Sequence, residues 1–87
     1  MQPQEIEQRL LTYLRQECDA SIDLDSDLLE SGYVDSLLVM ELVAFIKEQF
    51  EVTLGASDLA PRHFRSVARL TELVTSRRPA VAGSITA

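Results

Sequence analysis

The sequence predicts an all-α fold: a bundle of three main helices and one short helix, formed by a single domain. With 87 residues, of which 46% are hydrophobic, the chain is long enough for one small core. It holds only three glycines and three prolines, so long stretches are free to form helices. The β-branched and aromatic residues do not alternate over any long stretch, which argues against strands.

The first helix is expected over residues 3–17. Pro3 fits the first turn of a helix, where its missing N–H costs nothing. The apolar residues that follow recur at helical spacing and form one stripe, made of Ile6, Leu10, Tyr13 and Leu14.

Residues 18–35 form a connection longer than most links between helices, so we expect it to be functional or tethered to the bundle. Several of its apolar residues must pack on the bundle, since otherwise they would expose a large patch. They are Ile22, Leu24, Leu28, Leu29, Tyr33 and Val34. A short turn of helix is expected at residues 27–30, and Gly32 tolerates a positive φ.

The second helix is expected over residues 36–51, with Asp35 as the residue that caps its first N–H groups. One apolar stripe should face the core, and it consists of Val39, Leu42, Val43, Ile46 and Phe50. The opposite face mixes apolar and charged residues, namely Leu37, Met40, Glu41, Ala44, Lys47 and Glu48.

The rest of the chain predicts a short helix, a last main helix and a tail. Ser57 is expected to cap the short helix, which stops near Pro61, and Phe64 fills the gap before the last helix. That helix is expected over residues 66–76, with Val67, Leu70, Leu73 and Val74 buried. The domain should comprise residues 1–78, and the small-residue tail 79–87 is expected to be disordered.

The charge and the scarcity of reactive residues exclude several classes of function. A net charge of −6 argues against binding to nucleic acid or to an anionic membrane, and favours partners that present Lys and Arg. One cysteine, Cys18, cannot form an internal disulfide, and one histidine, His63, provides neither a metal site nor a catalytic triad. We therefore expect a non-enzymatic, cytoplasmic, monomeric protein with no secretory leader and no membrane span.

Ser36 is the candidate functional residue. It follows the expected cap Asp35, so its hydroxyl lies at the first helical position. A phosphate ester there would lie beside unpaired N–H groups and the positive end of the helix dipole. An isolated Asp-Ser pair at a helix start is more often a plain cap. Here, however, residues 25–54 read DSDLLESGYVDSLLVMELVAFIKEQFEVTL, and the chain resembles the acyl carrier protein family over residues 4–76.

This resemblance implies an acyl-carrier-like four-helix bundle in which Ser36 carries 4′-phosphopantetheine. It also implies that Asp35 helps the modifying enzyme engage the site, in addition to its role as a cap. The implied partners are a phosphopantetheinyl transferase, an acyl- or aminoacyl-loading enzyme, and downstream synthase or tailoring enzymes. No catalytic residue is expected in the chain itself, because covalent chemistry is supplied by the cofactor or by the partner.

The resemblance further implies that partners dock on the second helix. The expected docking residues are Leu37, Leu38, Met40, Glu41, Lys47 and Glu48. Fatty-acid carriers commonly have an aspartate where this chain has Leu38, and Lys47 interrupts the acidic run. Docking should therefore depend partly on apolar contact. Alternatively, Leu38 and Met40 only cover loop residues such as Tyr33.

The residues around the serine also bear on the cargo. Peptidyl carriers of multidomain synthetases usually have G-G-x-S, whereas this chain has Tyr33-Val34-Asp35-Ser36. The start at Met1, without a preceding linker, favours a free-standing protein. We expect a discrete acyl carrier of polyketide or nonribosomal natural-product biosynthesis. One alternative is an aminoacyl or peptidyl carrier of a free-standing adenylation system. The other, of a different class, is a small helical interaction module without modification.

Overall fold

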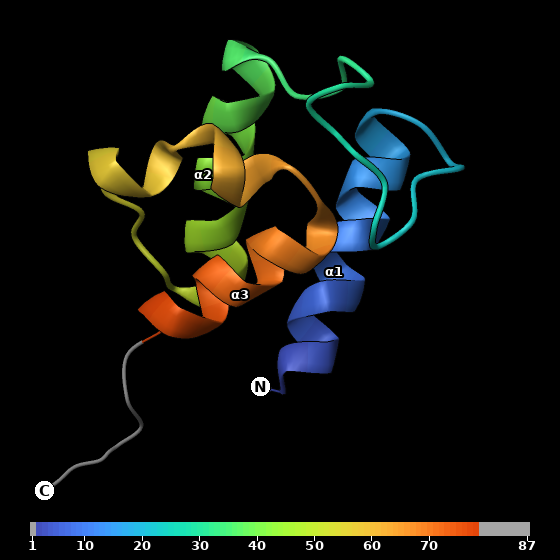
Figure 1. The fold of residues 1–87 in the computed structure, drawn as a ribbon. Helices are drawn as coiled ribbons and strands as arrows, with labels where there is room; N and C mark the ends of the chain where they lie inside the picture. Colours follow the sequence, from blue (N-terminus) through green and yellow to red (C-terminus); the bar gives the residue numbers. More distant parts are fainter. Residues whose placement is uncertain (1, 79–87) are drawn as a thin grey trace, which may run out of the picture.

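The computed structural model describes residues 2–78 and confirms the all-helical bundle. Its elements are α1 (Pro3–Glu17), α2 (Ser36–Phe50), two short 3₁₀ helices, η1 (Ala56–Leu59) and η2 (Pro61–Phe64), and α3 (Val67–Arg77). Figure 1 shows α1 and α2 running in opposite directions, with α3 lying obliquely across them. The predicted tail 79–87 lies outside the described residues. No helix within residues 2–78 is long and apolar enough to cross a membrane.

Helix α1 has the bounds that the sequence predicts, and its apolar stripe packs against α3. Ile6, Leu10 and Leu14 are fully buried, and Leu11 joins them in the core. Tyr13 is only partly buried at the edge of this stripe. The 3.6-residue period of the apolar positions therefore fixes which side of α1 faces inward.

The long connection between α1 and α2 is tethered to the bundle by backbone hydrogen bonds. The Leu28 N–H donates to the Arg65 carbonyl at 2.7 Å, and the Ala68 N–H donates to the Leu24 carbonyl at 3.2 Å. Ile22 and Leu28 are buried, as expected. These bonds join the loop to the start of α3, far along the chain, so the loop is part of the core.

Residues 27–30 form a hydrogen-bonded turn, so the prediction of a helical turn there is only approximately right. The Asp27 carboxylate accepts bonds from the N–H groups of Leu29 and Glu30, which competes with helix formation. Gly32, at φ +79°, then turns the chain toward α2, which confirms the expected positive φ.

The face of α2 that enters the core differs from the predicted face. Leu42, Ile46 and Phe50 are buried as predicted, but the fourth buried residue is Leu38, which is 6% exposed. Val39 and Val43 are half-buried at the edge of the core. Leu38, expected among the docking residues, is therefore a core residue, because residues 38, 42, 46 and 50 form one row at four-residue spacing.

The segment after α2 contains two 3₁₀ turns where the sequence predicts one short helix. Gly55, and not Ser57, is the capping residue, and its N–H donates to Asp58 Oδ2 at 3.0 Å. Pro61 begins the second turn, and Phe64 is buried as expected. α3 then starts after Ser66, whose hydroxyl accepts a bond from the Arg69 N–H, and its predicted stripe is buried.

Phe50 allows a direct test of the core. Replacing it with alanine should lower the free energy of unfolding by about 3–5 kcal/mol, because the side chain is only 5% exposed and its removal leaves a cavity. Urea unfolding measures the change, and Leu37→Ala on the exposed side of α2 is the matched control. Equal stability of Phe50→Ala and wild type would show that this residue is not part of the core.

Asp58 makes stability depend on pH. Its hydrogen bonds from the Arg77 side chain, at 2.9 Å, and from the Gly55 N–H lower the pKa of its carboxyl. The folded-state pKa thus lies below the unfolded value of about 3.9. The resulting stabilisation is fully present above the unfolded value and is lost as pH falls through the folded value.

We therefore expect Asp58→Asn to lower the melting temperature clearly at pH 7 and by less at pH 3, which lies below the unfolded value. Circular dichroism melts at both pH values measure this difference, with exposed Asp25→Asn as the control. A loss of stability that is the same at both pH values would contradict an ionic contribution from Asp58.

Candidate functional site

Ser36 is the first residue of α2 and its side chain is exposed. The preceding residue, Asp35, has an extended backbone and is the N-cap. Its Oδ1 atom accepts a hydrogen bond from the Leu38 N–H at 2.8 Å, and its carbonyl accepts one from the Val39 N–H at 2.9 Å. The predicted capping role of Asp35 is confirmed, and the cap holds Ser36 at the start of the helix.

The start of α2 is suited to an anionic group on the serine. Within residues 2–78, the N–H groups of Ser36 and Leu37 have no hydrogen-bond partner, since the cap engages those of the next two residues. Unpaired N–H groups and the positive end of the helix dipole stabilise a phosphate nearby. The first turn carries no acidic side chain, and the neighbouring Asp35 carboxylate is directed to the Leu38 N–H.

A cavity of about 420 Å³ adjoins Ser36. Apart from Asp35 and Ser36, its lining is apolar and comes from the loop before α2, from α2 itself and from the two 3₁₀ turns. The lining residues are Leu29, Val34, Asp35, Ser36, Val39, Met40, Leu59, Pro61 and Phe64. The hydroxyl thus lies at a cavity that can hold an apolar group.

Sequence reasoning did not identify this cavity. The 3₁₀ turns supply Leu59, Pro61 and Phe64, which lie more than twenty residues after Ser36 in the chain. The only signal was the number of apolar residues in irregular segments. Such residues must pack against something, but the sequence does not say that they pack around a space.

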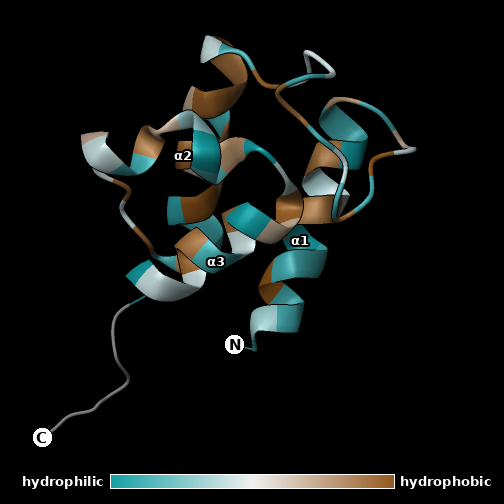
Figure 2. Ribbon diagram, in the orientation of Figure 1, coloured by the Kyte–Doolittle hydropathy of each residue, from teal (hydrophilic) through white to brown (hydrophobic). Residues whose placement is uncertain are grey.

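The outer face of α2 presents the other predicted residues. Leu37 and Met40 are 68% and 66% exposed, and they are the large hydrophobic side chains left exposed in the described part of the chain. Figure 2 shows the hydrophobic colouring of the first turns of α2. Glu41, Lys47 and Glu48 are also exposed, and Lys47 donates to the Thr53 hydroxyl at 3.2 Å. Leu38 is absent from this face, as described above.

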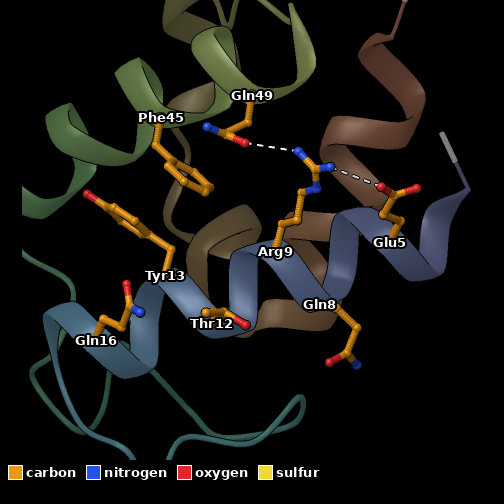
Figure 3. Close-up of a pocket in the computed structure, with 8 residues that line it drawn as sticks. All are labelled: Glu5, Gln8, Arg9, Thr12, Tyr13, Gln16, Phe45 and Gln49. Atoms are coloured by element: carbon orange, nitrogen blue, oxygen red, sulfur yellow. Dashed lines mark hydrogen bonds and ion pairs between the residues drawn. The ribbon is translucent and has the colours of Figure 1, made fainter.

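A second cavity, of about 350 Å³, lies between α1 and α2 and does not include Ser36. Figure 3 shows the Tyr13 ring stacked on Phe45, with ring centroids 4.2 Å apart. Beside the rings, Arg9 donates to Gln49 and to Glu5, both at 3.0 Å. The Tyr13–Phe45 stack and the Arg9–Gln49 bond join α1 to α2 and so support the helix that carries Ser36.

The described residues offer no catalytic group beside the serine. His63 is half-buried on η2 and does not line the cavity at Ser36. Residues 2–78 contain no cluster of three or more His, Cys, Asp and Glu residues able to hold a metal ion. Burial, together with the charge of Glu17, raises the pKa of the Cys18 thiol and so makes it less reactive.

Comparison with known proteins identifies the family. No curated protein matches the chain in sequence. The family model described as the phosphopantetheine attachment site matches residues 8–74, which is most of the chain and includes Ser36. Domains of this family carry a 4′-phosphopantetheine group and are carriers without catalytic activity. The chain therefore belongs to the phosphopantetheine attachment site family, and it is a helical carrier protein of the acyl carrier type.

Proposed function

We propose that Ser36 is the residue to which 4′-phosphopantetheine is attached. The observation that carries this proposal is its position as an exposed, capped first residue of α2 beside an apolar cavity. Four other serines of the described residues have bonded hydroxyls, whereas Ser31 and Ser57 are exposed and lie outside the α-helices. The Ser66 hydroxyl caps α3 and is 8% exposed, and those of Ser21 and Ser26 bond to loop neighbours. The Ser36 hydroxyl has no hydrogen-bond partner within residues 2–78.

Each part of the site has a role in this proposal. The cofactor supplies a thiol on which cargo is held as a thioester. Asp35 directs its carboxylate to the Leu38 N–H, which leaves the amides of Ser36 and Leu37 free for the phosphate. Asp35 also contributes to recognition by the transferase. The cavity formed by Val34, Val39 and Phe64 receives an apolar part of the arm or of its cargo.

We further propose a discrete carrier of acyl groups in polyketide or nonribosomal natural-product biosynthesis. The apolar lining of the cavity and the sequence Tyr33-Val34-Asp35-Ser36 support acyl cargo. Aminoacyl or peptidyl cargo from a free-standing adenylation system is the alternative. The family match argues against an unmodified interaction module. A carrier domain over residues 1–78, a cytoplasmic location and a monomeric state complete the proposal.

The proposed docking surface consists of Leu37, Met40, Glu41, Lys47 and Glu48 on α2. It would bind the phosphopantetheinyl transferase, the loading enzyme and the downstream enzymes. The support is the exposure of two large apolar side chains beside two carboxylates, close to the attachment point. Carboxylates at the rim mainly govern encounter with a basic partner, whereas apolar anchors govern the lifetime of the complex.

The attachment site can be tested by modification with a promiscuous phosphopantetheinyl transferase and coenzyme A. We expect wild type to gain the mass of one arm and Ser36→Ala to gain none, with unchanged helical circular dichroism. Ser31→Ala, at an exposed loop serine, is the control and should be modified as wild type is. Modification of Ser36→Ala would refute the assignment.

The docking surface can be tested by loading kinetics with the cognate loading enzyme at two salt concentrations. Glu41→Lys and Glu48→Lys should slow loading, and more strongly at low salt, because exposed charges are screened by ions. Leu37→Asp and Met40→Asp should slow loading at both salt concentrations. Leu38→Asp would test folding instead, because Leu38 is buried.

The matched controls lie on the exposed side of α3, namely Glu72→Lys and Thr75→Asp. Loading that is equally fast for the four α2 variants, the controls and wild type would show that partners dock elsewhere.

A further inference from the structure

A side-chain hydrogen bond joins the loop before Ser36 to the end of α1. The Tyr33 hydroxyl donates to Asp19 Oδ2 at 3.0 Å. The other oxygen, Oδ1, accepts bonds from the Ser21 N–H at 2.8 Å and from the Ser21 hydroxyl at 2.7 Å. Asp19 directly follows Cys18, the residue that caps the end of α1. The carboxylate that accepts the bond from Tyr33 is therefore itself held in place by the two bonds from Ser21 to its other oxygen.

The backbone of Tyr33 is fixed as well. Its N–H donates to the Leu28 carbonyl at 3.1 Å, and its carbonyl lies 4.0 Å from the Cys18 sulfur. Tyr33 thus contacts the rest of the molecule through its side chain and through both backbone polar groups. Tyr33 therefore links the end of α1 to the residues that come next in the chain, from Val34 to Ser36.

The residues that follow Tyr33 make up the attachment site. Val34 lines the cavity, Asp35 caps α2 and Ser36 bears the hydroxyl. Three peptide units separate the Tyr33–Asp19 hydrogen bond from the serine. Loss of this bond would remove one of the links between α1 and the loop, the others including the bond from Arg15 to the Ile22 carbonyl at 2.7 Å, and would leave Val34 and Asp35 less firmly held.

We propose that Tyr33 is a positioning residue for modification of Ser36, acting through its hydrogen bond to Asp19. This inference rests on the proposed attachment of the arm to Ser36. The bond keeps the loop in the conformation that presents the capped serine. Without the hydrogen bond, a smaller fraction of the protein is in the conformation that the transferase binds. The apparent affinity falls in proportion to that fraction. The turnover of the bound complex stays the same, because the transferase then holds the serine itself.

The test compares Tyr33→Phe with Tyr13→Phe in the unmodified 87-residue chain. Each variant loses one hydroxyl, but the Tyr13 hydroxyl has no hydrogen-bond partner within residues 2–78, and its ring stacks on Phe45 (Figure 3). With a phosphopantetheinyl transferase and coenzyme A, the KM for Tyr33→Phe should rise, by at most about tenfold. One lost hydrogen bond changes the ratio of competent to incompetent loop by about that factor, which is therefore the upper limit for the change in KM. The kcat should not change, and Tyr13→Phe should behave as wild type.

A second pair of variants tests the acceptor. Asp19→Ala should raise the KM by at least as much as Tyr33→Phe does. Asp25→Ala removes the same charge from an exposed position on the same loop and should have no effect. Thermal melts establish that every variant is folded.

Amide hydrogen exchange provides a readout that does not depend on the transferase. In Tyr33→Phe the amides of Val34 and Leu38, which bond to the Leu28 carbonyl and to Asp35, should exchange faster. Those of Leu42 and Ile46 in the core should not. A KM equal to that of wild type overturns the proposal. A raised KM without faster exchange also overturns it, because the hydroxyl would then contact the transferase directly.

The two proposals fail in different ways. Wild type that is not modified at Ser36 refutes the attachment site, whatever the exchange rates are. Wild type that is modified at Ser36, with an unchanged KM in Tyr33→Phe, refutes only the role of Tyr33.

Discussion

The connection between α1 and α2 has to bury apolar side chains while it leaves Ser36 at the surface. Burying Ile22 and Leu28 brings loop backbone close to the core, where unpaired N–H and carbonyl groups are costly. The bonds from Leu28 to Arg65 and from Ala68 to Leu24 satisfy these groups and tie the loop to the start of α3. The loop can then turn outward at Gly32 and deliver Ser36, capped, to the first turn of α2.

α2 serves both the core and the surface, because its apolar residues are more numerous than one buried row requires. Leu38, Leu42, Ile46 and Phe50 fill that row. Leu37 and Met40 are left in solvent beside the serine, which is unfavourable for a small protein unless another molecule covers them. Their exposure supports the docking surface proposed above. Docking of a partner would also account for the apolar residues of α2 that lie outside its buried row.

The sequence predicted what depends on local periodicity and missed what depends on distant contacts. Pro3 and one clear stripe defined α1, and Ser66 marked the start of α3 within one residue. In α2 two adjacent rows are apolar, so periodicity alone could not choose between Leu38 and Val39. The core buries Leu38 and leaves Val39 at its edge. The bonds from Tyr33 to Asp19 and from Arg77 to Asp58 span 14 and 19 residues, and no local pattern indicates them.

Those two carboxylates bond to two segments that line the cavity beside Ser36. Asp19 accepts a bond from Tyr33, the neighbour of Val34, and Asp58 accepts one from Arg77 and belongs to the turn that carries Leu59. Hydrogen bonds, chiefly from the Ser21 N–H to Asp19 and from the Arg77 side chain to Asp58, lower the pKa of both carboxyls, so both stay ionised at neutral pH. Their contributions are lost only as pH falls through these lowered values. The core row of α2 has no group that titrates. Acid therefore weakens the hydrogen bonds that these two carboxylates accept beside the cavity. It leaves the apolar packing of the buried row of α2 unchanged.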